Sequence, residues 1–315
     1  MKLQTQIPIR KESNQIDYDS RVLLLGSCFT ENIGAKLDYY KFQNLQNPFG
    51  ILFHPKPIER LIRRAVKLVQ FVESDIFEQD GQWRCMEVHS LVSHPDKITY
   101  LKLLNEKLAE FTEYLKNATH VIITFGSAWG YRYHKTNEIA GNCHKIPQKE
   151  FRKEIASVQD VSECMNNIAE AIHGLNPSAS LIYTVSPVRH LKDGFIENTR
   201  SKSHLIAGIH ALTDRDTAIS YYPSYEMMMD EMRDYRFYTE DMLHPNKTAV
   251  EIIWDRFEGV WIDPQTEPLR KEIASIQSGL AHKPFNPNSE SYREFQLDLQ
   301  QKISRIQDVL PHLEF

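Results

Sequence analysis

The feature of this 315-residue chain that most restricts its fold is a repeated alternation of short apolar runs with helical segments. A run that is apolar almost throughout is typical of a strand covered on both faces, as in a parallel sheet. A polar loop and a segment with helical spacing follow each run, which predicts crossover connections between parallel strands. The clearest runs span 21–25, 121–125, 181–185 and 218–222. We therefore expect an α/β protein, a three-layer α/β/α sandwich with a mainly parallel sheet of about five strands.

Two segments depart from this alternation. Between about residues 54 and 100, Asp80-Gly81 separates two short β-prone runs and predicts a hairpin within an inserted segment. Beyond Asp263-Pro264 the chain becomes charged and helical, with an apolar stripe at helical spacing. The stripe consists of Tyr292, Phe295, Leu299, Ile303, Ile306 and Leu310. We expect a main domain over 1–262 and a helical extension over 263–315 that docks on it or forms a homo-oligomer.

Composition excludes several classes of function. A hydrophobic content of 41% is enough for a sizeable core, and a net charge of −5 without a clustered basic face argues against a nucleic-acid partner. No stretch is apolar enough to predict a membrane span, and the N-terminus lacks the pattern of a signal peptide. The four cysteines have no spacing that indicates a disulfide framework. We expect a cytoplasmic protein with neither a membrane nor a nucleic-acid partner.

Two short segments far apart in the chain together predict a serine hydrolase. Ser27 directly follows the first apolar run, so its hydroxyl is expected at the carboxyl edge of the sheet, where open α/β folds bind ligands. Asp241 and His244 supply a carboxylate and an imidazole three residues apart. Serine needs a base to take its proton, and a carboxylate holds that base in the required tautomer. We predict Ser27 as nucleophile, His244 as base and Asp241 as the group that orients it.

Each part of this triad also has a structural interpretation. A serine at the end of a strand commonly caps the following helix, and Ser27 could cap the helix through Asn32 and Ile33. Asp241 could cap a turn, and His244 could be a buried, hydrogen-bonded histidine. The conjunction of both segments favours catalysis over either structural role.

The residues 26–30, Gly-Ser-Cys-Phe-Thr, together with 47–50, 186–190 and 241–246, resemble the GSCFA-domain family over roughly residues 20 to 262. That family is regarded as a divergent relative of the SGNH, or GDSL-like, hydrolases. The resemblance implies an SGNH-hydrolase-like, flavodoxin-like fold and a serine esterase that needs no cofactor. It further implies an oxygen-ester substrate, with a short acyl group such as acetyl on a carbohydrate.

Ester hydrolysis also needs hydrogen-bond donors for the developing oxyanion. The N–H of Ser27 is one candidate because it lies at a helix start. The resemblance implies the N–H of Gly50 as the second, although this glycine could serve only to allow a tight turn. The asparagine of the third SGNH block is absent from Gly126-Ser127-Ala128-Trp129. The side chains that could replace it as donors are Ser127, Trp129, Asn142 and Asn47.

Several polar residues follow predicted strands and are candidate substrate contacts, since such loops commonly carry binding residues. The forked guanidinium of Arg189 suits a carboxylate, a phosphate or sugar hydroxyls, and Trp129 could stack on a sugar ring. The full set is Asn47, His89, Ser127, Trp129 and Arg189.

Three other interpretations compete with a serine esterase. Cys28 follows Ser27 at the same predicted helix start and could be the nucleophile. Zinc could bind Cys143 and His144 together with Cys28 or His134, but no recognisable ligand spacing is present, so we expect no metal. The chain could also be a catalytically inactive module that binds a glycan or another small ligand.

Overall fold

The computed structural model describes residues 5–216, 218–311 and 313–315. Within these residues a central sheet has five strands in the order β10-β9-β5-β1-β2, and every neighbouring pair is parallel. The expected α/β class and the parallel sheet are confirmed. The strands are β1 (Arg21–Gly26), β2 (Gln43–Gln46), β5 (His120–Phe125), β9 (Ser180–Val185) and β10 (Ile219–Tyr222).

This strand order is the flavodoxin-like one, in which the direction of winding reverses beside the first strand. The reversal falls between β1 and β5, which pair from Val22 with His120 to Gly26 with Thr124. Open α/β sheets bind ligands outside the carboxyl ends of the strands at such a point. Residues just after Gly26 and Phe125 therefore occupy the favoured position for a site.

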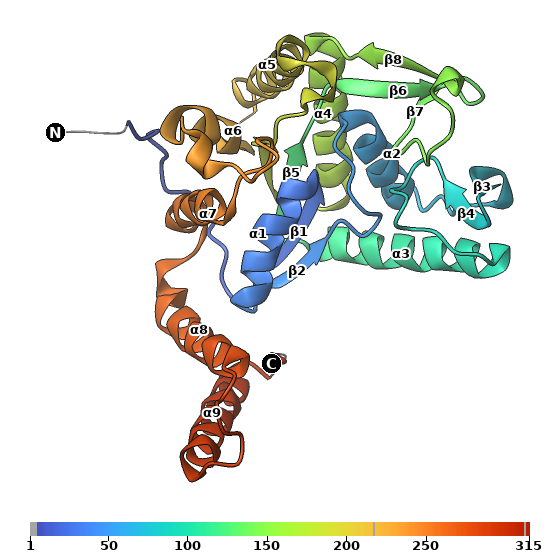
Figure 1. Ribbon diagram of the computed structural model, residues 1–315. Coiled ribbons are helices and arrows are strands. Elements are labelled where there is room, and N and C mark those ends of the chain that lie inside the picture. Colours follow the sequence, from blue (N-terminus) through green and yellow to red (C-terminus); the bar gives the residue numbers. More distant parts are fainter. Residues whose placement is uncertain (1–4, 217, 312) are drawn as a thin grey trace.

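Helices cover both faces of the sheet, as Figure 1 shows. Leu23 and Leu25 of β1 belong to the core under α2, α3, α4 and α5, whereas Val22 and Leu24 belong to the core under α1 and α7. This alternation along one strand produces the three-layer sandwich. The helices are α1 (Cys28–Tyr39), α2 (Pro55–Val66), α3 (Lys97–Asn117), α4 (Val158–Leu175), α5 (Phe195–Thr213) and α7 (Lys247–Trp261).

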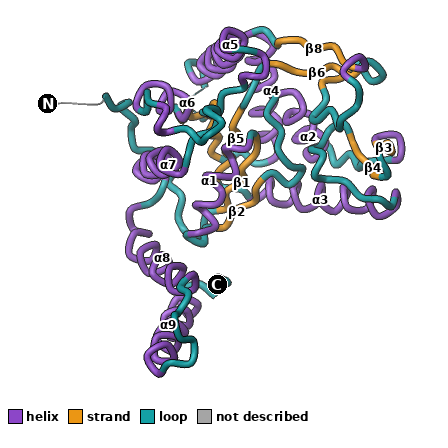
Figure 2. Tube along the Cα trace, viewed as in Figure 1, coloured by secondary structure: helices purple, strands orange, loops and turns teal. Residues whose placement is uncertain are grey.

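Smaller elements lie outside the sandwich (Figure 2). The predicted hairpin is confirmed as β3 (Ile76–Gln79) and β4 (Gln82–Cys85), and both Asp80 and Gly81 have positive φ in its turn. A second antiparallel sheet, of order β7-β6-β8, follows β5. Its strands are β6 (Trp129–Tyr133), β7 (Glu138–Ile139) and β8 (Phe151–Ile155), and a short helix α6 (Ser224–Glu226) follows β10.

The C-terminal helices α8 (Glu267–Ala281) and α9 (Glu290–Val309) pack on each other and extend away from the sandwich (Figure 1). Of the predicted stripe, Ile303 and Ile306 are buried, while Phe295 is 37% exposed. The pair attaches to the end of α1, where the Gln277 side chain donates to the Tyr39 carbonyl at 3.2 Å. In the described ranges, no helix combines the length and the apolar character needed to cross a bilayer.

His54 caps the N-terminus of α2 in a buried position. Its Nδ1 accepts the Lys56 N–H at 3.1 Å, and burial lowers the pKa of the imidazole to about 4 from 6.5. Between pH 6.5 and about 4, His54 therefore binds a proton in the unfolded chain but not in the folded chain. Stability that is present above about pH 6.5 is lost as the pH falls toward 4.

We expect His54→Asn to weaken this acid sensitivity, because asparagine keeps the capping acceptor and does not titrate. The fall in the free energy of unfolding between pH 6.5 and 4 should shrink by up to about 3 kcal/mol, as measured by urea titration at a series of pH values. His134→Asn, at an exposed position, serves as the control. Parallel curves for wild type and His54→Asn would contradict the prediction.

Candidate active site

Ser27 lies at the carboxyl end of β1, as predicted, and it is the N-cap of α1. Its Oγ accepts the Phe29 N–H at 3.3 Å, and its backbone is extended, as N-caps require. The residue is 1% exposed. The structural role weighed for this serine is therefore present, and the hydroxyl is covered by its neighbours.

Asp241 and His244 form a close pair. Asp241 Oδ2 lies 2.6 Å from His244 Nδ1, and both side chains are about half exposed. The hydroxyl of Thr239 and the N–H groups of His244 and Leu243 all donate to Asp241 Oδ1. These bonds, with that from Thr239 the largest cause, hold the pKa of Asp241 far below its usual range. An ionised carboxylate requires the proton on Nδ1, which leaves His244 Nε2 as an acceptor suited to a base.

Arg189 lies in the segment after β9 and bonds to the loop that carries His244. The Arg189 N–H donates to the Leu243 carbonyl at 3.2 Å, and its guanidinium donates to the Met242 carbonyl at 2.5 Å. The guanidinium also lies over the Tyr238 ring at 4.4 Å. Arg189, predicted as a substrate contact, thus holds two loops together in this structure.

His190, the residue after Arg189, lies near Ser27. A Cβ built on Gly126, just after β5, would lie 3.4 Å from Ser27 Cβ and 3.3 Å from His190 Nε2. His244 contributes to the lowered pKa of His190, so the two rings lie near each other. Residues from β1, β5, β9 and the loop before α7 therefore converge, although among the described residues no hydrogen bond joins the Ser27 hydroxyl to His244.

The two amides predicted for the oxyanion hole already donate within the fold. The Ser27 N–H bonds to the Thr124 carbonyl at 3.0 Å, because the pairing of β1 with β5 continues past Gly26. The Gly50 N–H bonds to the Asn47 carbonyl at 2.7 Å, which closes a turn. A pre-formed hole needs its donors aimed at the reacting oxygen, so this site would need others.

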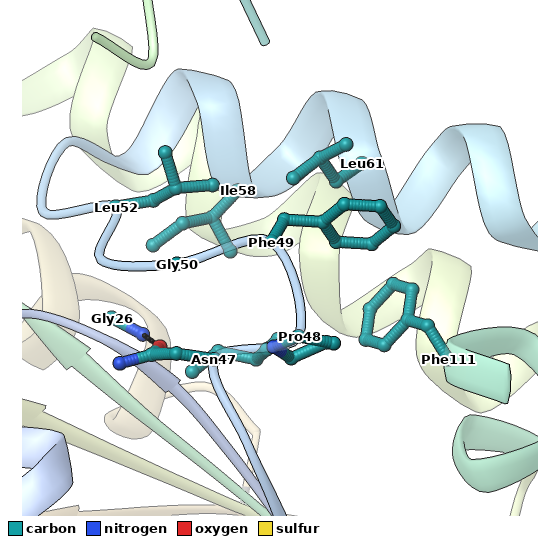
Figure 3. Close-up of a pocket in the computed structure, with 10 residues that line it drawn as sticks. Gly26, Asn47, Pro48, Phe49, Gly50, Leu52, Ile58, Leu61 and Phe111 are labelled. Carbon is teal, nitrogen blue, oxygen red and sulfur yellow. Dashed lines mark hydrogen bonds between the residues drawn. The ribbon is translucent and has the colours of Figure 1, made fainter. Parts of the chain in front are cut away.

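Asn47 offers one such donor beside Ser27. Its Oδ1 accepts the Gly26 N–H at 2.9 Å, as Figure 3 shows, so its amide nitrogen faces elsewhere. That Nδ2 is buried and has no hydrogen-bond partner among the described residues. Buried donors without a partner are rare in folded proteins and call for an explanation. Asn142, the other asparagine proposed as a donor, uses its Oδ1 to accept the His144 N–H at 2.8 Å within its own loop.

A narrow, mainly apolar pocket adjoins Gly26 and Asn47 on the side of α2 and α3 (Figure 3). The rings of Phe49 and Phe111 meet edge to face at 5.6 Å within it. Its other lining residues are Leu25, Pro48, Gly50, Leu52, Ile58 and Leu61. The pocket has the chemistry to receive a small apolar group.

The remaining predicted contacts divide into two groups. Ser127 Oγ pairs with Ser201 Oγ at 3.1 Å, and the Trp129 indole donates to the Glu197 carbonyl at 3.2 Å, so α5 holds both side chains. His89 instead lies against Gly50, where an added Cβ would come within 2.4 Å of His89 Cβ. His89 therefore stays beside the candidate site, whereas Ser127 and Trp129 support the fold.

Lys202 of α5 is a functional candidate that the sequence did not indicate. It is 1% exposed, and its Nζ donates at 2.7 Å to the carbonyls of Gly126 and Ser186, which follow β5 and β9. Burial lowers its pKa to about 7. Lys202 lies in a helix next to two serines and a histidine, a polar context that predicts a solvent-exposed lysine. The local sequence therefore does not predict the burial of this side chain.

Phe53 is a second residue that the sequence did not indicate. Its carbonyl accepts the N–H groups of Gly126 and Ser127, and the Leu52 N–H bonds to the Gly26 carbonyl at 3.0 Å. Its ring lies 5.7 Å from that of His190. The segment 51–54 thus crosses the ends of β1 and β5 and helps to cover Ser27.

The competing sites receive less support. Burial raises the pKa of the Cys28 thiol, with a smaller contribution from Glu31, so the activated thiolate of a cysteine nucleophile is not favoured. His144 Nε2 lies 2.8 Å from the Cys85 carbonyl oxygen. In the part of the chain that the structure describes, no three His, Cys, Asp or Glu side chains gather as metal ligands would.

Fold and site together define a flavodoxin-like α/β protein with a polar site at the carboxyl ends of its parallel strands. The GSCFA family model matches residues 21–257, and that of the GSCFA domain protein, C-terminal domain, matches 273–315. The chain therefore belongs to the GSCFA family, as the four segments indicated. No curated protein matches it.

Proposed function

We propose that this protein is a serine esterase that uses Ser27, His244 and Asp241. The observation that carries the proposal is the 2.6 Å bond between Asp241 and His244, in a loop that Arg189 ties to the strand ends where Ser27 lies. This arrangement supplies an oriented base at the correct edge of the sheet.

The reaction follows from these roles. His244 Nε2 takes the Ser27 proton as Oγ attacks the acyl carbon, and the carbonyl oxygen becomes an oxyanion that accepts a hydrogen bond from Asn47 Nδ2. The tetrahedral species collapses as His244 gives its proton to the departing alcohol. Water, activated in turn by His244, then releases the carboxylic acid and restores Ser27. No step requires a cofactor.

The proposed substrate is a short acyl ester, such as an acetyl group on a carbohydrate hydroxyl. The narrow apolar pocket beside Gly26 supports the short acyl group, since its aromatic and aliphatic lining excludes water around a methyl. The carbohydrate follows from the SGNH resemblance. Esters of p-nitrophenol with acyl chains of increasing length, and acetylated sugars, would separate the acyl preference from that for the alcohol.

The burial of Ser27 leads to a prediction about access. Phe53 and His190 both approach Gly126 beside Ser27, and Phe53 comes closest, so an ester reaches the hydroxyl only after Phe53 shifts. We expect an alkyl fluorophosphonate to label Ser27 slowly in wild type, and at least about tenfold faster in Phe53→Ala. Mass spectrometry of the labelled peptide measures both rates.

Two variants control this experiment. Ser27→Ala should abolish the label, and Phe77→Ala, which removes a half-buried ring from the β3–β4 hairpin, should leave the rate unchanged. Equal rates in wild type and Phe53→Ala would show that Phe53 does not limit access.

The same burial favours a second candidate function, a binding module that has kept the fold without catalysis. In that case Ser27 only caps α1. Folded protein that no fluorophosphonate labels, in wild type or in Phe53→Ala, would support this alternative. Calorimetric titration with acetylated sugars would then identify the ligand.

A further inference from the structure

His190 holds a buried polar atom that the proposed mechanism does not use. Its Nε2 is buried, has no hydrogen-bond partner within the part of the chain that the structure describes, and lies 3.3 Å from the point that a Gly126 Cβ would occupy. Ser27 Cβ lies 3.4 Å from the same point. A lone buried polar atom beside a candidate nucleophile indicates a partner that arrives with the substrate.

We propose that His190 donates a hydrogen bond from Nε2 to the oxyanion that forms when Ser27 attacks an ester. The inference rests on the proposed esterase function and adds a residue to it. His190 takes the place of the asparagine that SGNH hydrolases carry in their third block. It comes from the end of β9 rather than the end of β5.

The surroundings of His190 favour a donor over a second base. Burial is the main cause that lowers the pKa of its imidazole to about 3, with smaller contributions from the nearby Lys202 and His244 side chains. A ring of such low basicity takes no proton from serine at neutral pH. It stays neutral and keeps one N–H, which can polarise a carbonyl as a neutral imidazole does in other enzymes.

The fold also holds His190 in place. Its backbone N–H donates to Asn198 Oδ1 at 2.9 Å, and its ring lies 5.7 Å from that of Phe53. Lys202 joins the carbonyls of Gly126 and Ser186 and so holds the two strand ends at a fixed separation. An oxyanion hole depends on such rigid support.

Gly126 lets Ser27, His190 and Phe53 pack close together. A Cβ at this position would come within 2.6 Å of Phe53 Cβ, in addition to its approach to Ser27 and His190. A substrate oxygen can therefore lie between Ser27 and His190 only after Phe53 shifts, as proposed for access to the hydroxyl. Asn47 Nδ2 is a second buried donor near this point, since Asn47 Oδ1 accepts the Gly26 N–H, and neither donor has a partner among the described residues.

Hydrolysis of p-nitrophenyl acetate by His190→Ala and His190→Gln tests the role. Loss of one oxyanion donor typically lowers kcat by about 10²–10³-fold, which we expect for His190→Ala with little change in KM. Glutamine keeps an N–H near the position of Nε2 and cannot act as a base, so His190→Gln should recover at least about tenfold of that loss. His204→Gln is the control, because this histidine lies in α5 and its ring nitrogen Nδ1 already bonds to the Ala156 carbonyl at 2.7 Å.

Each result has a defined meaning, provided that thermal unfolding shows folded variants. Wild-type rates in both His190 variants would overturn the inference and leave the esterase intact. Equal losses in His190→Gln and His190→Ala would overturn a donor role. A wild-type protein that neither hydrolyses the ester nor accepts a fluorophosphonate would overturn the proposed function and this inference with it.

Discussion

We expect Ser27→Ala and His244→Ala each to lower the turnover of p-nitrophenyl acetate by about 10⁴-fold or more. The double variant should be no slower than either single one. The reason is that the base has no proton to take without the hydroxyl, and the hydroxyl stays a weak nucleophile without the base. Steady-state kinetics on the three variants measure both the size and the non-additivity of the losses.

Asp241→Asn and Ser127→Ala complete this series. Asparagine at 241 would favour the wrong tautomer of His244, so we expect a loss of about 10⁴-fold. Ser127 is held by Ser201 of α5, so Ser127→Ala should change turnover by less than about threefold if the protein stays folded. Small, independent losses in Ser27→Ala and His244→Ala would rule out the triad.

Gly26→Ala should destabilise the protein by about 3 kcal/mol or more. Gly26 has φ of 128°, a region that residues with a Cβ rarely adopt, and a Cβ there would lie 2.1 Å from the Thr124 carbonyl oxygen. That oxygen belongs to the backbone of β5 and accepts the Ser27 N–H, so it cannot move without breaking the β1–β5 pairing. Urea unfolding measures the loss.

Gly259→Ala is the matched control for this change. Gly259 lies within α7, and nothing approaches within 4 Å of a Cβ at this position. Alanine in a helix interior is favoured over glycine by about 0.5–1 kcal/mol, so this variant should be as stable as wild type or more stable. A Gly26→Ala protein with wild-type stability would show that the strand end tolerates a side chain.

Local sequence patterns predicted most of the central sheet because buried parallel strands consist of consecutive apolar residues. The runs at 21–25, 121–125 and 181–185 all lie within strands of the structure. The strand β2 escaped prediction because Gln43, Asn44 and Gln46 give it a polar, half-buried character at the sheet edge. The β6–β8 sheet escaped for a similar reason, since charged residues recur along its strands.

In the candidate site, the local sequence predicted contacts within one loop but not contacts between distant segments. The spacing of Asp241 and His244 predicted their pairing, because residues three apart in one loop can meet without help from the rest of the fold. The N–H groups of Ser27 and Gly50 are occupied by backbone hydrogen bonds that depend on the register between two strands and on the closure of a turn, which the local sequence does not specify. The burial of Lys202 and of the His190 Nε2 atom depends on packing between distant elements, which no local pattern records.

The bond from Phe29 N–H to Ser27 Oγ has a consequence for the timing of any reaction. Forming an acyl-serine would replace a hydroxyl oxygen by an ester oxygen, which accepts hydrogen bonds less well. The start of α1 would then lose a contribution of about 1 kcal/mol for as long as the acyl group remained. Amide hydrogen exchange at Phe29 should therefore quicken in the acylated protein, so that fraying of one helix end marks the lifetime of the intermediate.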